Sequence, residues 1–197
     1  GATGLRRPFQ AGLRRGDAIT ATVGHDQRNR VVAVEITAIN GVAPDEAQRR
    51  PEFQSLIASY PDQKVTLETG RPAKGGPELT RRAIDLIAPV GYGQRALIVA
   101  PARAGKTMLL QAVIEGIAIN HPEAALFILL VDERPEEVSD MITLGYGEVI
   151  ASSFDMPAVR HTDGSEMTLE RARRLLELGR DVVIVSSIDN THHHYII

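Results

Sequence analysis

Apolar and polar residues alternate in two segments near the start of the chain. Residues 17–23 read DAITATV and residues 31–39 read VVAVEITAI, and in both segments apolar side chains recur at about every second position. A period of two places these side chains on one face of a strand, so both segments are predicted to be half-buried strands. The polar stretch GHDQRNR, residues 24–30, separates them and predicts a hairpin loop.

From residue 83 onward, the pattern changes to continuous apolar runs that alternate with helical patterns. The runs predict strands at 95–100, 125–131, 148–153 and 181–188. Helices are predicted between them, at 107–119, 135–144 and 165–178. The first of these helices carries apolar residues on one side, namely Leu109, Leu110, Val113, Ile114 and Ile117. Strands that are apolar throughout are typical of a parallel sheet covered by helices on both faces, and they predict an α/β fold.

The intervening residues 41–82 are rich in Pro, Gly, Glu and Arg, and we interpret them as a linker. Within this linker we expect a short helix near 51–59 and a strand at 64–68. The clearest flexible joint is GRPAKGGPE at 70–78. The chain is thus expected to consist of a β segment at 1–42, a linker at 43–82, an α/β domain at 83–190 and a tail at 191–197.

The composition narrows the class of protein. The chain has 197 residues, of which 43% are apolar, so it can bury a substantial core. It contains no cysteine, which excludes disulfides and thiolate chemistry. It also has no apolar stretch of the roughly 18 residues that a membrane span requires, and its first residues lack the apolar run of a signal peptide. We therefore expect a cytoplasmic protein that does not contact a membrane.

Charge is distributed unevenly along the chain. The net charge of −3 argues against a protein that binds nucleic acid over its whole surface. Residues 1–50 contain eight Arg and five acidic residues, whereas residues 91–197 contain nine basic and fifteen acidic residues. A basic front favours RNA contact ahead of a domain that binds a metal–nucleotide complex. Ordinary surface charge is the alternative explanation of the same distribution.

The segment LIVAPARAGKTML, residues 97–109, ends like a phosphate-binding loop between a predicted strand and a predicted helix. In such a loop the backbone N–H groups and the helix N-terminus attract phosphate. Lys106 would reach the β- and γ-phosphates, and the hydroxyl of Thr107 would hold Mg²⁺. Ala100 stands where the generic motif has a glycine, five residues before Gly105. A strand-to-helix turn without a ligand is the alternative.

Two further segments carry candidate chemistry. LLVDERPEEV, residues 129–138, places Asp132 and Glu133 at the carboxyl end of a predicted strand, where parallel sheets bind ligands. A carboxylate there can polarise the water that attacks a γ-phosphate, and Arg134 is a candidate nucleotide contact. The alternative is that these acidic residues only favour the start of a helix. This alternative explains PEE, residues 135–137, better than it explains DER, residues 132–134. The glycines of VGYGQRA, residues 90–96, allow the backbone to approach a ligand closely.

These segments, in this order, resemble the bacterial transcription termination factor Rho family. GYGQRALIVAPARAGKTMLLQ is similar to the phosphate-loop segment of that family, in which Ala also occupies the position of Ala100. NHPEAALFILLVDERPEEVSDM is similar to the segment with the catalytic glutamate, and GEVIASSFDMPAVRH to the segment after it. The resemblance extends without gaps from about residue 83 to residue 183. LRRGDAITATV and VVAVEITAIN look like part of the family's cold-shock-like RNA-binding barrel.

The resemblance implies a RecA-like P-loop NTPase, with a parallel sheet and helices on both faces, preceded by a partial OB or cold-shock-like β segment. It implies a homohexameric RNA-dependent ATPase and helicase that moves along single-stranded RNA and releases it from RNA polymerase, with ATP and Mg²⁺ as cofactors. Glu133 and Lys106 are the implied catalytic residues, and Thr107 is the implied Mg²⁺ contact. The implied ATP site consists of Gly91, Tyr92, Gly93, Gln94, Arg95, Ala96, Arg103, Ala104, Gly105, Lys106, Thr107, Met108 and Arg134.

The sequence departs from the family pattern at several places. The resemblance implies that half of the barrel, the central-pore RNA loops and the arginine finger lie outside this chain. Arg30 stands where the family has an aromatic residue, so we expect weak RNA binding. Ser187 occupies the position of the family's Mg²⁺-binding Asp, or Ser186 does if one residue is deleted, and Asp189 is out of register. We therefore expect ATP to be bound but hydrolysed slowly or not at all.

Three functions stay open at this point. The first is a Rho-type ATPase segment, and the second is a non-catalytic Rho-like module that binds nucleotide or joins a ring. The third is another P-loop ATPase, such as a rotary ATP synthase subunit, which VAPARAGKT and VDERPEE disfavour. The tail THHHYII matches no segment of the Rho family, and it is either a stray or engineered end or, through residues 192–194, a metal-binding group.

Overall fold

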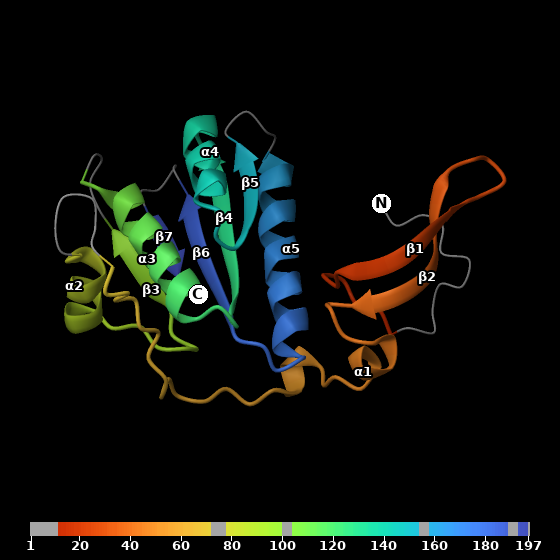
Figure 1. Cartoon of the computed structure of the whole chain (residues 1–197), viewed down its shortest axis with the longest axis horizontal. Helices are drawn as coiled ribbons and strands as arrows, with labels where there is room; N and C mark the ends of the chain where they lie inside the picture. Colours follow the sequence, from red (N-terminus) through yellow and green to blue (C-terminus); the bar gives the residue numbers. More distant parts are fainter. Residues whose placement is uncertain (1–11, 72–77, 100–103, 154–157, 189–192, 197) are drawn as a thin grey trace. The chain divides into compact units, whose positions relative to one another are not determined.

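The computed structural model describes residues 12–71, 78–99, 104–153, 158–188 and 193–196 (Figure 1). These residues form two compact units. The first unit contains the residues up to Leu56 together with Leu169–Gly179, and the second contains Ile57–Thr168 and Arg180–Ile197. Within the described ranges, no helix has both the length and the apolar character needed to cross a membrane.

A two-stranded antiparallel sheet begins the first unit. Strand β1 (Ile19–His25) pairs with β2 (Val31–Ile39), which confirms the predicted hairpin. The turn between them is closed by Asp26, whose carboxylate accepts hydrogen bonds from the backbone N–H groups of Arg28 and Arg30 at 2.8 and 2.9 Å. Helix α1 (Pro44–Gln48) follows, and its Ala47 is buried together with Ile39 of β2.

The prediction of a helix near 51–59 is wrong. The structure has only the short 3-10 helix η1 (Phe53–Ser55) in this segment. Every residue from 51 to 64 is exposed, so a longer helix would bury no apolar face. Because short helices owe most of their stability to such burial, the segment stays extended on both sides of η1.

A five-stranded sheet forms the centre of the second unit. Its strands are β3 (Ala96–Val99), β4 (Ala125–Glu133), β5 (Glu148–Ser153), β6 (Val182–Ile188) and β7 (His193–Ile196). They lie in the order β3-β7-β6-β4-β5. Strand β4 is parallel to both β5 and β6, which confirms the predicted parallel sheet for these three strands.

Strand β7 departs from the prediction, because the sequence predicts only a tail at 191–197. The structure places His193–Ile196 between β3 and β6, antiparallel to both. The sheet is therefore mixed rather than wholly parallel. Since β7 is antiparallel to both neighbours, β3 runs in the same direction as β6 and β4. The carboxyl ends of β3, β4 and β6 consequently lie at one edge of the sheet.

The helices of the second unit are α2 (Thr80–Ile87), α3 (Lys106–Asn120), α4 (Pro135–Leu144) and the first part of α5 (Ala158–Leu176). The predictions for α3 and α4 are confirmed within a residue. Helix α2 was not expected, because it begins inside the predicted linker. Helix α5 begins seven residues earlier than the predicted start at 165, and it continues through Asp163 and Gly164.

The core of the second unit lies between the sheet and helices α3 and α4. It contains Val65, Leu67, Leu110, Val113, Ile114, Ile117, Leu126, Ile128, Leu130, Met141, Val183 and Val185. Consecutive residues of β4 are all buried, from Leu126 to Leu130. Since successive side chains of a strand point to opposite faces, β4 is covered on both faces, as the continuous apolar run predicts.

The prediction of a strand at 64–68 is also wrong, although its apolar side chains do face the core. Val65 and Leu67 are 5% and 3% exposed and pack against α3. Their segment makes a single bridge to the sheet region, between Lys64 and Gly91. The carboxylate of Asp85 on α2 accepts hydrogen bonds from the backbone N–H groups of Leu67 and Glu68, at 3.0 and 2.9 Å. The Asp85 carboxylate thus accepts the backbone hydrogen bonds that a neighbouring strand would otherwise accept.

Candidate functional site

The turn at the start of α3 has a left-handed glycine directly before the helix. Gly105 is the N-cap residue of α3, with a left-handed φ of 87°, and a Cβ at this position would have no neighbour within 4 Å. Glycine is thus required by the backbone conformation rather than by crowding. Lys106 and Thr107 follow as the first residues of the helix, and both are half-buried. Ala104 is exposed, as is Met108 at 75%.

The N-terminus of α3 suits a negatively charged ligand. Its first turn contains no acidic residue, so the partial positive charge of the helix end is not neutralised within the helix. Free backbone N–H groups at such an end bind phosphate oxygens. The predicted contact Arg103, and Ala100 at the position of the motif's glycine, belong to residues 100–103, which lie outside the described residues. The described part therefore contains the second half of the predicted loop.

Glu133 ends strand β4 as a buried carboxylate. The strand continues two residues beyond the predicted end at 131 and includes Asp132, which has a φ of 60°. The pairing of β4 with β5 shifts register between Val131 and Glu133. A bulge of this kind redirects the following side chain. Glu133 is only 3% exposed.

Ser187 of β6 contacts this carboxylate. Its hydroxyl donates a hydrogen bond to Oε1 of Glu133, and Ser187 pairs in register with Leu130 on the neighbouring strand. Of the two serines that the sequence offers for the family's Mg²⁺-binding Asp position, Ser187 and Ser186, one contacts Glu133. This serine is Ser187. Asp189, the other acidic candidate, lies outside the described residues.

The start of α3 and Glu133 lie at the same edge of the sheet. Lys106 follows the carboxyl end of β3, Glu133 forms the carboxyl end of β4, and Ser187 lies near the carboxyl end of β6 (Figure 1). Ligands of open α/β sheets bind at this edge. Lys106 is a cationic side chain beside a helix N-terminus, and Glu133 is a carboxylate at the end of β4, with strands β7 and β6 between β3 and β4. Such groups are those needed to bind a phosphate chain and to orient water.

Arg134 is the N-cap residue of helix α4, and it is exposed beside Glu133. Pro135 occupies the first turn of this helix, and Glu136 and Glu137 follow in the same turn. These features favour the start of a helix. These features explain PEE, residues 135–137, as the start of a helix. They do not explain Glu133, which is buried and precedes the helix.

The remaining predicted site residues lie at the opposite edge of the sheet. Gly91, Tyr92, Gly93, Gln94 and Arg95 precede the amino end of β3, whereas Lys106 follows its carboxyl end. Four residues of strand separate the two groups, which corresponds to about 13 Å. The structure therefore does not bring this segment to Lys106 and Glu133.

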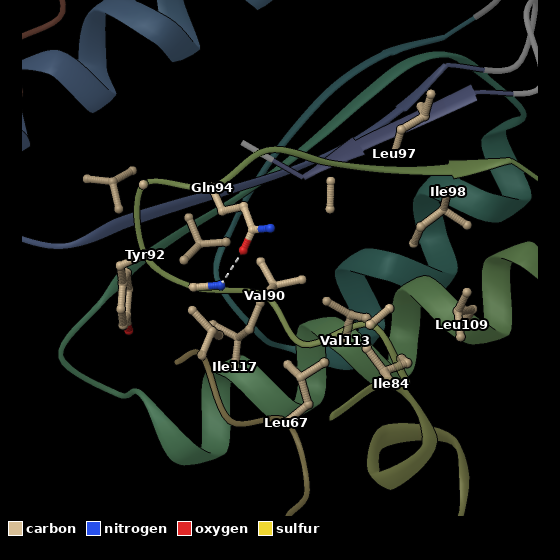
Figure 2. A pocket seen from close by; sticks show the side chains of 17 residues that line it. Leu67, Ile84, Val90, Tyr92, Gln94, Leu97, Ile98, Leu109, Val113 and Ile117 are labelled. Carbon is tan, nitrogen blue, oxygen red and sulfur yellow. Dashed lines mark hydrogen bonds between the residues drawn. The ribbon is translucent and has the colours of Figure 1, made fainter. Parts of the chain in front are cut away.

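The segment 91–96 forms a structural turn and lines an apolar pocket. The backbone N–H of Gly91 donates to Oε1 of Gln94 at 3.0 Å. A Cβ on Gly91 would come within 3.1 Å of the backbone oxygen of Gln63, so glycine allows the close approach of two backbones here. Figure 2 shows the pocket, in which Tyr92 and Gln94 lie among aliphatic side chains.

Tyr92 illustrates the environment at this edge. Burial raises the pKa of its phenol above the usual 10.0, and the carboxylates of Asp181 and Glu123 raise it further. Asp181 directly precedes β6, and Glu123 lies two residues before β4. The ring of Tyr92 meets that of His121 edge-on, with centroids 5.7 Å apart and planes at 84°. Acidic groups surround this position, which is unfavourable for phosphate.

One polar pair at the phosphate-loop edge was not predicted. Nδ1 of His161 on α5 lies 2.7 Å from Oγ of Ser152 on β5, and Ser152 is 6% exposed. Ser152 is close to the carboxyl end of β5, next to the end of β4 that carries Glu133. The signal in the sequence is a serine near the end of an apolar strand, which points to the ligand-binding edge of a parallel sheet.

Comparisons with known proteins identify the family of this chain. Residues 80–195 match the family model of the ATP synthase alpha/beta family, nucleotide-binding domain. The chain is similar to transcription termination factor Rho from Gemmatimonas aurantiaca, with 70% identity over 173 residues that cover 88% of this chain and 24% of the relative. It is 48% identical to Rho from Streptomyces lividans over 179 residues, covering 88% of this chain and 25% of the relative.

A third relative, Rho from Cereibacter sphaeroides, is 46% identical over 178 residues, which cover 89% of this chain and 42% of the relative. The chain thus spans about a quarter of the length of the first two relatives and less than half of the third. The resemblance found in the sequence is confirmed. The family model relates the nucleotide-binding domain to that of ATP synthase subunits, whereas the individual relatives are Rho factors.

Proposed function

Because this chain belongs to the ATP synthase alpha/beta nucleotide-binding domain family and is homologous to transcription termination factor Rho, we propose that it forms the ATP-binding part of a Rho-type, RNA-dependent ATPase. The observation that carries the proposal is the shared edge of the sheet. The turn Gly105-Lys106-Thr107 and the buried carboxylate of Glu133 both lie there.

Each residue at this edge has a role in the proposed site. The N–H groups at the start of α3 bind phosphate oxygens, and Lys106 contacts the β- and γ-phosphates. The Thr107 hydroxyl would hold the metal ion that accompanies the nucleotide, and Mg²⁺ would supply charge neutralisation there. Glu133 accepts a hydrogen bond from the water that attacks the γ-phosphate and thereby orients it. Arg134, exposed beside Glu133, is a proposed nucleotide contact.

We expect slow hydrolysis, because Glu133 already accepts a hydrogen bond from Ser187. That contact occupies one carboxylate oxygen in the described structure. A serine at 187 also contributes no negative charge near the metal, whereas the Rho-like pattern implies an Asp at this position. ATP turnover is the measurement that distinguishes this proposal from a non-catalytic module, which would bind nucleotide and show no turnover with or without single-stranded RNA.

Nucleotide binding is tested by Lys106→Ala. Calorimetric titration with ATP and Mg²⁺ should show binding by the unchanged chain and none by the variant, while circular dichroism shows an intact fold. Lys64→Ala is the matched control, because Lys64 lies near the opposite edge, where it pairs with Asp85 at 3.5 Å. Equal ATP affinity of Lys106→Ala and the unchanged chain would mean that the loop is only a turn.

Arg95→Ala tests the part of the site that rests on resemblance alone. Arg95 is exposed and precedes β3, far from Lys106 along the strand. We expect its replacement to leave ATP affinity unchanged. A loss of affinity similar to that of Lys106→Ala would show instead that residues 91–96 contact the nucleotide, as the resemblance implies.

We also propose that the first unit binds single-stranded RNA, weakly and in a salt-dependent way. For the Rho-type protein we further propose RNA polymerase as a partner and assembly into a homohexameric ring. Arg28 and Arg30 are exposed at the tip of the hairpin. Arg30 is paired with Asp26 at 2.7 Å, which limits its contribution to phosphate binding. Fluorescence anisotropy with a pyrimidine-rich oligomer should show affinity that falls steeply with salt. Tight binding with a flat salt dependence would contradict this. A cytoplasmic location stays a prediction from the sequence.

A further inference from the structure

The second unit contains a cavity of about 180 Å³ that the proposed ATPase function does not use. It lies between helices α2 and α3, strand β3 and the extended segment around Val65 and Leu67. Figure 2 shows Leu67, Val113 and Ile117 on one side and Ile98 and Gln94 on the other. Nucleotide phosphates bind at the carboxyl edge of the sheet, so this cavity is a separate feature.

The cavity has a buried apolar floor and an accessible rim. Val65, Leu67, Val113 and Ile117 line it with exposures of at most 5%. Leu97, at 49% exposure, belongs to the rim. A small molecule can therefore enter from solvent and reach a surface that water does not contact in the folded chain.

Water is a poor occupant of the floor of such a space. A water molecule needs two to four polar partners, and the floor consists of aliphatic side chains. Protein interiors are packed as closely as organic crystals, so a gap of this size leaves its lining without contacts. Cavities of about 150 Å³ with aliphatic linings stay dry and take up benzene-sized molecules. The dimensions and the lining thus select a compact apolar ligand.

Of the two lining residues with polar side chains, Tyr92 and Gln94, the exposed Gln94 gives the cavity chemical direction. The side-chain oxygen of Gln94 accepts the hydrogen bond from the backbone N–H of Gly91, which fixes the orientation of the amide. The amide nitrogen then lies on the other side of the group, and Figure 2 shows it among the lining side chains, on the side of Val90. An amide nitrogen only donates hydrogen bonds. A ligand that presents an acceptor oxygen to it would gain a directed contact.

We propose that this cavity binds a small, neutral aromatic molecule with one hydrogen-bond acceptor, whose ring packs against Val113 and Ile117 and whose acceptor takes a hydrogen bond from Nε2 of Gln94. Charged ligands are excluded, because the floor supplies no group that would compensate a buried charge. Binding of this ligand requires neither ATP nor RNA. Ligand binding and the proposed ATPase function are therefore tested by separate measurements, and one proposal can fail without the other.

The test uses two probes of similar shape, acetophenone and ethylbenzene, which differ in a carbonyl oxygen. Methyl resonances of Val113 and Ile117 are followed by NMR during titration of the whole chain. Both probes should shift these resonances, and acetophenone should bind about 3–10-fold more tightly, the effect of one neutral hydrogen bond. Absence of shifts at these methyl groups, or equal affinity for the two probes, would overturn the proposal.

Two variants separate the apolar and the polar part of the site. Gln94→Glu keeps an oxygen for the Gly91 N–H but removes the donor, so the preference for acetophenone should disappear while the fold is retained. Val113→Phe fills the floor and should abolish the binding of both probes. If Val113→Phe fails to fold, Gln94→Glu still decides, because an unchanged preference for acetophenone in that variant contradicts the proposed contact.

Discussion

The two units of this chain are stabilised by opposite means. In the first unit, the interior includes a cluster of charged groups: Asp17, Arg50 and Glu177 have side chains that are at most 2% exposed. In the second unit, the core is a continuous cluster of aliphatic side chains and Met141. This unit also buries Arg81 and Asp85 on α2, whereas its buried Glu133 and Ser187 lie at the edge of the sheet where we place the ligand.

The ionic interior of the first unit joins parts of the chain that are far apart in sequence. Arg50 contacts Asp17 at 2.6 Å and Glu177 at 3.3 Å. Glu177 also pairs with Arg14 at 2.9 Å and with Arg174 at 3.1 Å. Replacing both members of a buried ion pair with apolar residues changes the free energy of unfolding little. Removing only one member lowers it strongly, because the other charge stays buried without its partner. The first unit therefore depends on charge balance, and the second on apolar packing.

The largest effect is expected from Arg50→Met, which keeps an unbranched apolar stem and removes the charge. Asp17 and Glu177 would then share a buried site with less compensating charge, and we expect the first unit to lose about 3–5 kcal/mol of unfolding free energy. Amide hydrogen exchange under increasing urea measures this for β1 and β2 separately from β4. Arg49→Met, at an exposed neighbouring position, should change stability by less than about 0.5 kcal/mol. Similar effects of the two variants would refute the ionic-core interpretation.

This ionic core could not have been predicted from the sequence, whereas the sheet of the second unit could. The run at 125–131 is apolar throughout because both faces of β4 are buried, so the pattern itself reveals the burial. Arg14, Asp17 and Arg50 look like ordinary surface charges, since no period marks them. Their partners depend on contacts across 33 to 163 residues of sequence, which no local pattern contains.

The candidate site was predictable to a similar degree. Lys106 and Glu133 follow predicted apolar strands, and strand direction brings both to one edge. The contact between Glu133 and Ser187 depends on the register of β4 and β6, which the apolar runs do not specify. Residues 91–95 were assigned by resemblance rather than by position in the fold, and the structure places them at the other edge. Strand β7 carries no continuous apolar run, so its pairing was not foreseen.

The apolar side of the comparison is tested by Ile114→Ala. Ile114 is fully buried on α3, and the variant leaves a cavity in the core of the second unit. We expect a loss of about 3 kcal/mol of unfolding free energy, measured by amide exchange in β4 and β6. Ile142→Ala is the matched control, because Ile142 on α4 is 58% exposed. A loss confined to β1 and β2 would contradict the division into two differently stabilised units.

A pH titration should distinguish the units further through Asp17. Burial alone would raise the pKa of this carboxyl. Hydrogen bonds from the Arg50 side chain, the backbone N–H of Arg14 and the Asn40 side chain outweigh that effect and hold the pKa below 3.8. A lowered pKa in the folded state means that the ionised form stabilises the unit above pH 3.8. This stabilisation is lost as the pH falls from 3.8 through the folded-state pKa.

Asp17→Asn should therefore lower the free energy of unfolding by about 1–2 kcal/mol at neutral pH. Below pH 3.8, the variant should lose less additional stability than the unchanged chain does. The cost is smaller than for Arg50→Met because Arg50 keeps Glu177 as a partner. The urea midpoint of exchange in β1 and β2 is the measurement, taken at a series of pH values. Asp45→Asn, at an exposed position of α1, is the control and should follow the unchanged chain. An identical acid profile for Asp17→Asn and Asp45→Asn would contradict this prediction.

The smallest effect is expected where the second unit does bury a polar contact. Ser187→Ala removes the hydroxyl that donates to Glu133 and leaves the aliphatic surroundings unchanged. We expect a loss of about 1 kcal/mol, because Glu133 has further interactions that remain. Ser186→Ala is the control: Ser186 is also 5% exposed, but its side chain leaves the opposite face of β6. The two variants should differ in ATP turnover more than in stability, since Ser187 contacts the carboxylate that we propose orients water. If Ser186→Ala alters ATP turnover as much as Ser187→Ala does, then the hydrogen bond from Ser187 to Glu133 only stabilises the fold. The buried carboxylate of Glu133 would then have the same kind of role as the charged groups inside the first unit.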